Sequence, residues 1–175
     1  MCYWNSIMIT LDAIDSSSDD ELQSLLFREL EQNVSAGHGS PEFLAQIRNL
    51  PVGLRAMAAT SELDVSFALD DLGWHFGNWH TTELSEETAR GLEELGDAEL
   101  ASLFRQAFEI AQRYWTELGS EGWMRWYHGS EFERQTRPLN DKARSILASK
   151  GGSLFKYWVD YARHHPERIG AGEED

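Results

Sequence analysis

The residues that could do chemistry are mostly carboxylates, and they are concentrated in one stretch. Residues 62–99 hold eleven Asp and Glu but one base, Arg90, so this stretch carries −10 of the chain's net charge of −15. Like charges on neighbouring helical turns destabilise a helix by about 0.2–0.5 kcal/mol per pair, so solubility alone does not require such concentration. We therefore expect an acidic partner-binding surface here, formed by Asp70, Asp71, Glu83, Glu86, Glu87, Glu93, Glu94, Asp97 and Glu99.

Carboxylates in rows on adjacent helices can imitate a phosphate backbone. A protein that grips phosphates with Lys and Arg would then bind the carboxylates instead, with the same dependence on salt. The alternative is a solvated face without a partner. Glu86, Glu87, Asp97 and Glu99 fall near expected helix starts, where the helix dipole stabilises acids in any case.

The spacing of polar residues gives little support to a phosphate-binding, metal or catalytic site. The chain has no Gly-rich phosphate loop, H-E-x-x-H or C-x-x-C motif. His75 and His80 are five residues apart, so together with Glu83 they could bind a metal only if the chain bends between them. Asp70 and Asp71 are weak candidates for a catalytic pair, because adjacent helical side chains point about 100° apart. We expect no catalytic residue, no metal and no cofactor, and therefore not an enzyme.

Aromatic side chains cluster at Trp123, Trp126 and Tyr127. Such residues could stack on bases, but the strongly negative chain would repel nucleic acid. We expect them to pack in the core or to contribute to a dimer interface.

The composition sets the broad class. A chain of 175 residues with 41% hydrophobic residues can form one domain around a proper core. Its one cysteine, Cys2, excludes an intrachain disulfide and fits a reducing compartment. No stretch approaches the roughly 18 apolar residues that a membrane span needs, and the N-terminus lacks a signal-peptide pattern. We expect a cytoplasmic protein that contacts neither membrane nor nucleic acid directly.

Apolar residues recur at helical spacing along nearly the whole chain, which indicates an all-α fold. We expect a single compact multi-helix domain over residues 1–169, with an acidic tail at 170–175. Residues 1–16 could form a short strand or an arm. The helices are expected to start at Ser17 or Ser18, at Ser40-Pro41, near Pro51, and then to cover 62–79, 85–96, 97–118, 139–149 and 152–165.

Two of these helices lead to sharper predictions. Residues 62–79 are apolar on two sides, so this helix should be the most buried, with Asp70 partly buried and paired. Residues 97–118 keep the 3.6-residue period for about twenty residues and should form the longest helix, with Asp97 as its cap. Ser85 should cap the helix between them.

Part of the chain resembles a known family. The stretch Leu72-Gly73-Trp74-His75-Phe76-Gly77-Asn78 is followed by Gly91-Leu92, Leu95-Gly96 and the helical run from Ala101 to Phe108. The closing segment 139–168 adds Tyr161, His165, Pro166 and Glu167. Together these resemble the bacterial DNA-mimic protein family over about 100 residues. Asp70-Asp71, Leu72 and Trp74 stand where that family has Gly-Gly, Phe and Gln.

The resemblance implies an all-α homodimer whose surface imitates the charge of DNA. It also implies a basic DNA-binding partner, such as a helix-turn-helix repressor, that is kept off its operator. An immunity-type inhibitor of a basic nuclease toxin would use the same acidic face, and an enzyme is the third class. A dimer interface should use the basic C-terminal half, because the −10 stretch would repel itself.

Overall fold

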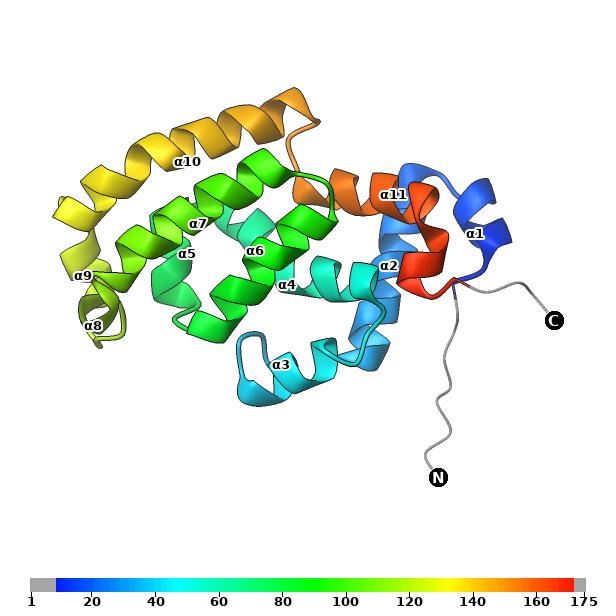
Figure 1. The fold of residues 1–175 in the computed structure, drawn as a ribbon, viewed down its shortest axis with the longest axis horizontal. Helices are drawn as coiled ribbons and strands as arrows, with labels where there is room; N and C mark the ends of the chain where they lie inside the picture. The colour runs from blue at the N-terminus through cyan, green and yellow to red at the C-terminus, as the bar shows by residue number, and fades with distance from the viewer. Residues whose placement is uncertain (1–8, 172–175) are drawn as a thin grey trace.

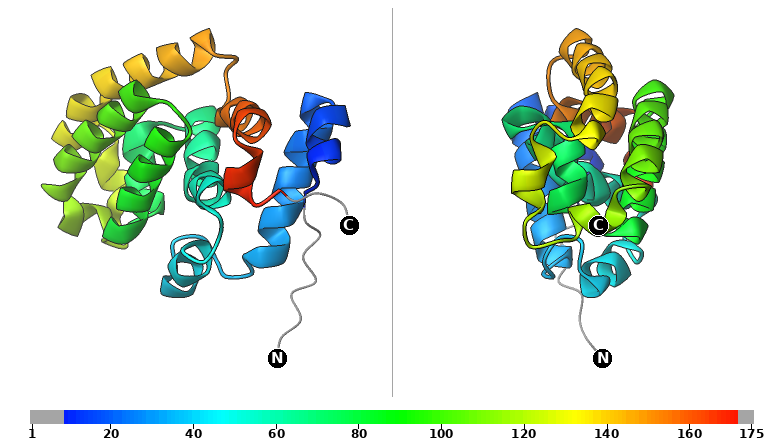
Figure 2. Two further views of the ribbon diagram at one scale, coloured as in Figure 1. Left: turned by 45° about the vertical axis from the view of Figure 1, so that its right-hand side comes forward. Right: turned by 90° about the vertical axis from the view of Figure 1, so that its left-hand side faces the viewer.

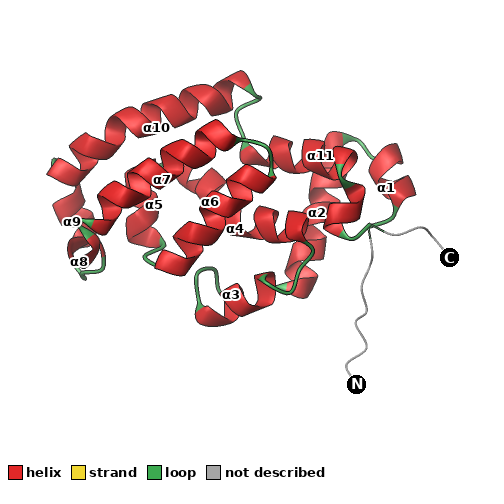
Figure 3. Ribbon diagram, in the orientation of Figure 1, coloured by secondary structure: helices red, strands yellow, loops and turns green. Residues whose placement is uncertain are grey.

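The computed structural model describes residues 9–171, and this part of the chain folds mostly into α-helices (Figure 1, Figure 3). The all-α class and the single compact domain predicted from the sequence are confirmed. Half of the predicted N-terminal strand or arm, residues 1–8, lies outside the described residues, and residues 11–16 of the other half are helical. In the described chain no helix is long and apolar enough to cross a membrane. In chain order the helices are α1 Leu11–Ser16, α2 Asp19–Asn33, α3 Pro41–Ile47, α4 Val52–Leu69, α5 Leu72–Asn78, α6 Thr82–Glu94, α7 Ala98–Gln112, α8 Trp115–Leu118, α9 Trp123–Tyr127, α10 Glu131–Ser149 and α11 Leu154–His164, followed by the 3-10 turn η1 Pro166–Ile169.

Short polar side chains start several helices by capping their free N–H groups. The Ser18 hydroxyl accepts from the backbone N–H of Glu21, whose carboxylate accepts in return from Ser18, so α2 begins with a complete capping box. Ser40 starts α3, as predicted from the Ser-Pro pair. Asp97 starts α7, where its carboxylate accepts from Leu100 N–H at 2.9 Å.

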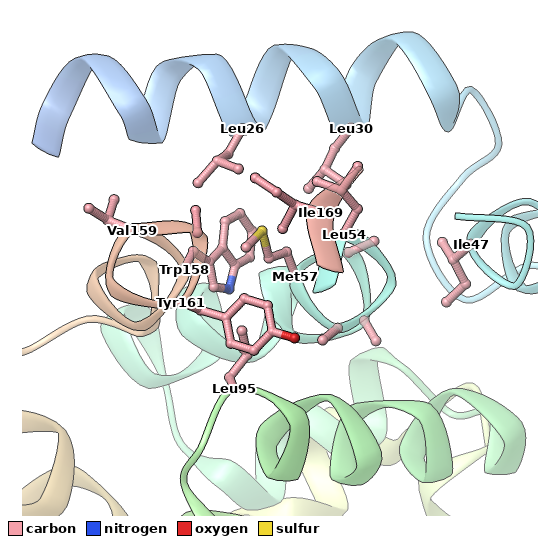
Figure 4. Close-up of a cluster of buried hydrophobic side chains, with 14 of the residues drawn as sticks. Leu26, Leu30, Ile47, Leu54, Met57, Leu95, Trp158, Val159, Tyr161 and Ile169 are labelled. Atoms are coloured by element: carbon pink, nitrogen blue, oxygen red, sulfur yellow. The ribbon is translucent and has the colours of Figure 1, made fainter. Parts of the chain in front are cut away.

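Helix α4 joins two clusters of buried side chains. The first lies among α2, the first half of α4 and α11, where Met57 packs near Trp158 (Figure 4). The second lies among α5, α6, α7 and α10 and takes Leu63 and Phe67 from the far half of α4. Figure 2 shows α1 and α2 on the side of α11 away from α7 and α10. The molecule therefore has an α1–α2 end and an α8–α9 end.

Two helices cross closely because one residue at the crossing has no side chain. A Cβ on Gly91 of α6 would lie 2.9 Å from the Ala56 carbonyl of α4. Only glycine therefore fits there without moving a backbone, and the approach brings the charged residues of α6 next to those of α4.

The predicted helix over 62–79 is wrong as a single element. It breaks at Asp70, which ends α4, and Asp71 caps α5. Leu69 is 76% exposed and Asp70 is exposed as well, so the prediction of a partly buried, paired Asp70 is also wrong. The most continuously buried run lies earlier in α4, from Ala56 to Thr60. Apolar residues continue across the break because α4 and α5 both pack on the core. The helical period of the apolar residues therefore does not reveal the break.

Three further boundaries differ from the predictions. The 97–118 helix is interrupted after Gln112, so the 19-residue α10 is the longest among the described residues. The helix expected over 139–149 starts earlier, at Glu131, and runs through Pro138, which removes one N–H from the helix ladder. The carbonyl that loses its partner belongs to Arg134, an exposed residue, so water can satisfy it. Helix α6 starts at Thr82, and Ser85 is buried inside it rather than capping it.

Candidate functional site

The fold sorts the nine predicted acidic residues into buried and exposed sets. Glu87 is 2% exposed and Asp97 is 1% exposed, so neither can meet a partner. Asp71 and Glu94 are half-buried. The exposed set contains Asp70, Glu83, Glu86, Glu93 and Glu99. The prediction that these nine residues form a partner-binding surface is therefore wrong for Glu87 and Asp97.

Glu87 lies at the centre of an ion-pair network that joins three helices or their ends. Arg55 of α4 donates to it through Nε at 2.9 Å and Nη2 at 2.6 Å. Arg48 at the end of α3 lies at 3.2 Å, and Arg90 lies at 3.3 Å one turn along α6. Burial would raise the pKa of Glu87, but the hydrogen bonds from Arg55 and Arg48 outweigh it and lower that pKa. The carboxylate thus stays ionised as a structural link.

A cleft of about 410 Å³ adjoins this network. Its walls carry both signs of charge. The cations are Arg55 and Arg90, and the carboxylates are Glu87, Glu93 and Glu94. Each of these side chains has an ion-pair partner within the described chain. The cleft therefore presents satisfied charges rather than a catalytic acid, base or nucleophile.

Tyrosines from the C-terminal half hold the partly buried carboxylates. Tyr157 donates to Asp97 at 2.6 Å, and Lys150 contacts the same oxygen at 3.0 Å. Burial would raise the pKa of Asp97, but these contacts and its cap bond lower it. Tyr161 donates to Glu94, and Arg168 pairs with Glu94 at 2.6 Å. Burial and the neighbouring Glu94 raise the pKa of Tyr161 to about 12.

Asp71 acts in the same way at the start of α5. One oxygen of its carboxylate accepts from Trp74 N–H at 2.7 Å and from the Tyr127 hydroxyl at 2.6 Å. Burial, followed by this bond to Asp71, raises the pKa of Tyr127. Asp71 therefore fixes the α4–α5 turn against α9, which assigns it a structural role.

Three of the five exposed candidates already pair with cations. Glu86 lies 3.3 Å from Arg90 on the same helix, Glu93 contacts Arg105 of α7, and Glu99 lies 3.0 Å from Lys142 of α10. Exposed pairs of this kind are worth only about 0–1 kcal/mol, so a partner's cations can replace them. Glu83 and the Asp70 side chain make no ion pair with a described residue.

Charge without a counterion is densest at the α1–α2 end. Residues 12–21 hold five acids and no base, which we call the acidic corner: Asp12, Asp15, Asp19, Asp20 and Glu21. All five side chains are exposed. One ion pair reaches them, from Arg163 of α11 to Asp19 at 2.8 Å. Arg163 also donates to the carbonyls of Ile14 and Ser17, which fastens this corner to α11.

Sequence reasoning missed the acidic corner because it counted charge over long segments. Residues 1–61 have a net charge of only −5, since Arg48 and Arg55 fall in the same segment. In the fold both arginines form ion pairs with Glu87 and not with the acidic corner. The signal that could have found the corner is local density, because five acids in ten residues exceed the density of the 62–99 stretch.

The histidines make structural contacts inside the fold. His75 is buried, its Nδ1 lies 2.8 Å from the Ser66 hydroxyl, and burial lowers its pKa to about 3. His80 stacks on Trp115 with ring centroids 4.0 Å apart. The described residues contain no group of three or more His, Cys, Asp or Glu side chains placed to hold a metal, so the His75–His80–Glu83 alternative is not formed.

The aromatic cluster packs as expected from the sequence. Tyr127 is buried, and Trp123 and Trp126 are half-buried. Trp123 lies edge-on to Trp74 with ring centroids 4.7 Å apart. A Cβ on Gly77 would collide with the Trp123 ring, so glycine is what lets the indole lie on α5.

No family model, curated protein or solved structure matches the chain. The likeness to DNA-mimic proteins stays a prediction that rests on the residues quoted for it.

Proposed function

We propose that this protein is an acidic DNA mimic that occupies the DNA-binding surface of a basic DNA-binding protein. The observation that carries the proposal is an imbalance of charge on the surface. Among residues 9–171, fourteen exposed carboxylates make no ion pair, against five exposed cations without one. Such a surface attracts and steers a basic partner.

The acidic corner is the best candidate for the contact. Its carboxylates lie in a short helix and in the first turn of the next, so the backbone fixes their positions. They need not give up an internal ion pair before they bind, apart from Asp19. The exposed candidates Glu83, Glu86, Glu93 and Glu99 are the second set, of which the last three must exchange existing pairs for the partner's cations.

The test compares variants with equal charge changes. The corner variant carries Asp12→Asn, Asp15→Asn and Asp20→Asn. A second variant carries Glu83→Gln, Glu86→Gln and Glu93→Gln. The control carries Glu42→Gln, Asp141→Asn and Glu167→Gln, which are exposed, make no ion pair with a described residue and lie outside the α8–α9 end. Proteins that elute from a DNA column are passed over each immobilised variant, and captured proteins are challenged with duplex DNA.

A DNA mimic must lose its captured partner to DNA and to salt. We expect the corner variant to slow association by about tenfold at low salt, because charge steers the encounter, while the control retains binding. A partner that holds the protein and duplex DNA at the same time would contradict mimicry. Equal losses in all three variants would mean that net charge alone drives capture, which would contradict a specific surface.

A further inference from the structure

A cavity of about 220 Å³ lies where the chain enters α1 and passes beside α2. One wall comes from Ile9, Thr10 and Ala13, and the other from residues of α2. Its lining is mainly apolar, with one carboxylate among the residues: Ile9, Thr10, Ala13, Leu25, Arg28, Glu29 and Gln32. No interaction described above uses this cavity.

Glu29 is a buried carboxylate without a cation. Its side chain belongs to a residue that is only 8% exposed. One oxygen, Oε1, accepts from Asn33 Nδ2 at 3.0 Å, and Oε2 is not among the fully buried side-chain atoms of the described residues that lack a partner. Burial raises the pKa of Glu29, and the Asn33 bond offsets this only in part. A carboxylate that has no cation beside it in mainly apolar surroundings is stabilised by a cation that binds there.

Arg28 shares the cavity wall but does not neutralise Glu29. Its side chain is exposed and makes no ion pair with any described residue. Adjacent positions on a helix point about 100° apart, which explains why the neighbouring charges do not meet. Arg28 instead adds a positive charge that opposes any second cation in the cavity.

We propose that this cavity binds an alkylammonium group, with the ammonium on Glu29 and the methylene chain along Ile9, Ala13 and Leu25. A lysine side chain has this chemistry, since its stem is apolar and its head carries a compact charge. A small inorganic cation would leave the apolar walls unused, and an alcohol would leave the carboxylate without a counterion. The site rests on the proposed function only in assigning the lysine to a basic partner, which the adjacent acidic corner would attract.

The probe is n-pentylammonium, titrated into the full chain and followed by the amide signals of residues in the cavity wall. We expect saturable shifts at Ala13, Leu25 and Glu29, and weaker binding of n-pentanol. Glu29→Gln keeps the side-chain volume and should weaken the probe about tenfold or more, because a charge-assisted hydrogen bond is lost. Glu31→Gln, which removes an exposed charge two residues away, should change affinity less than about twofold.

Two further variants separate binding from folding. Arg28→Gln should tighten the probe, because it removes a competing cation. Ala13→Leu leaves Glu29 in place but fills the cavity, and should abolish the shifts. Equal binding of the probe by Glu29→Gln, equal binding of n-pentanol, or no saturable binding by the unmodified chain would overturn the proposal.

The source of the ammonium is tested with a blocked Ala-Lys-Ala peptide and with 1,5-diaminopentane. Binding of the peptide in the same cavity supports a partner's lysine. Binding of the diamine without the peptide overturns that assignment. If the peptide binds here and yet no captured protein is displaced by DNA, the cavity stands and the proposed function falls.

Discussion

Glu87 carries one charge in the sequence and meets three arginines in the fold. Those contacts come from α3, α4 and α6, so losing the charge loosens three elements at once. Removing one partner of a buried pair costs about 3–5 kcal/mol, and we expect the lower end because Arg48 and Arg90 can turn to water. We therefore predict that Glu87→Gln lowers the free energy of unfolding by about 3 kcal/mol, measured by urea titration.

Its neighbour Glu86 is the matched control. Glu86 is exposed and pairs with Arg90 at the i, i+4 spacing. Such pairs are worth about 0.3–0.5 kcal/mol, so Glu86→Gln should barely shift the unfolding midpoint. Equal effects of the two substitutions would mean that the Glu87 network does not stabilise the fold.

At the scale of the element, the turn between α4 and α5 depends on one of two adjacent aspartates. Asp71 caps α5 and accepts the hydroxyl of buried Tyr127, whereas the Asp70 side chain is exposed. A lost cap costs about 1 kcal/mol, and an unsatisfied buried hydroxyl costs about 1–3 kcal/mol more. We predict that Asp71→Ala destabilises the protein by about 2–3 kcal/mol.

Asp70→Ala removes the same charge one residue earlier and should stay within about 0.5 kcal/mol of the unmodified protein. Thermal unfolding followed by circular dichroism distinguishes the two. A larger loss for Asp70→Ala than for Asp71→Ala would argue against the capping role. It would point to a contribution from the exposed carboxylate that the ion pairs do not reveal.

At the scale of the whole molecule, the α8–α9 end suits self-association. Met124 is 51% exposed beside the half-buried Trp123 and Trp126, and Arg125 and Arg113 are exposed without ion pairs. Aromatic residues, Met and Arg are enriched at protein interfaces. This end lies opposite α1 along the long axis, so a dimer formed here leaves the acidic corner accessible (Figure 1).

We predict a homodimer at micromolar concentration, measured by light scattering. Met124→Asp should give a monomer, because it places a charge in the centre of the contact. Val52→Asp, at an apolar residue that is 40% exposed on α4, should remain a dimer. A monomer mass for the unmodified chain would contradict the prediction, including its placement in the basic C-terminal half.

The sequence by itself determined the helical class, the starts of some helices such as α2, α3 and α7, and the overall charge. Helical periodicity and capping residues such as Ser18 and Asp97 act over three or four residues, so they can be read locally. The helix breaks at Asp70 and after Gln112 could not be predicted from the sequence, because apolar residues on both sides of each break pack on the core. The start of α10 at Glu131, eight residues before the expected one, was not predicted either.

Only the tertiary structure decided which carboxylates belong to the surface. Six cations from outside the 62–99 stretch fold onto its acids: Arg48, Arg55, Arg105, Lys142, Lys150 and Arg168. A count along the chain cannot include these pairs, because they join residues far apart in sequence. Coulomb interaction depends on distance and on burial, so Glu87 and Asp97 became structural links while the acidic corner kept its charge. The best candidate binding surface is therefore the acidic corner, whose carboxylates are the least neutralised. It is not the 62–99 stretch, although that stretch is the most acidic in the sequence.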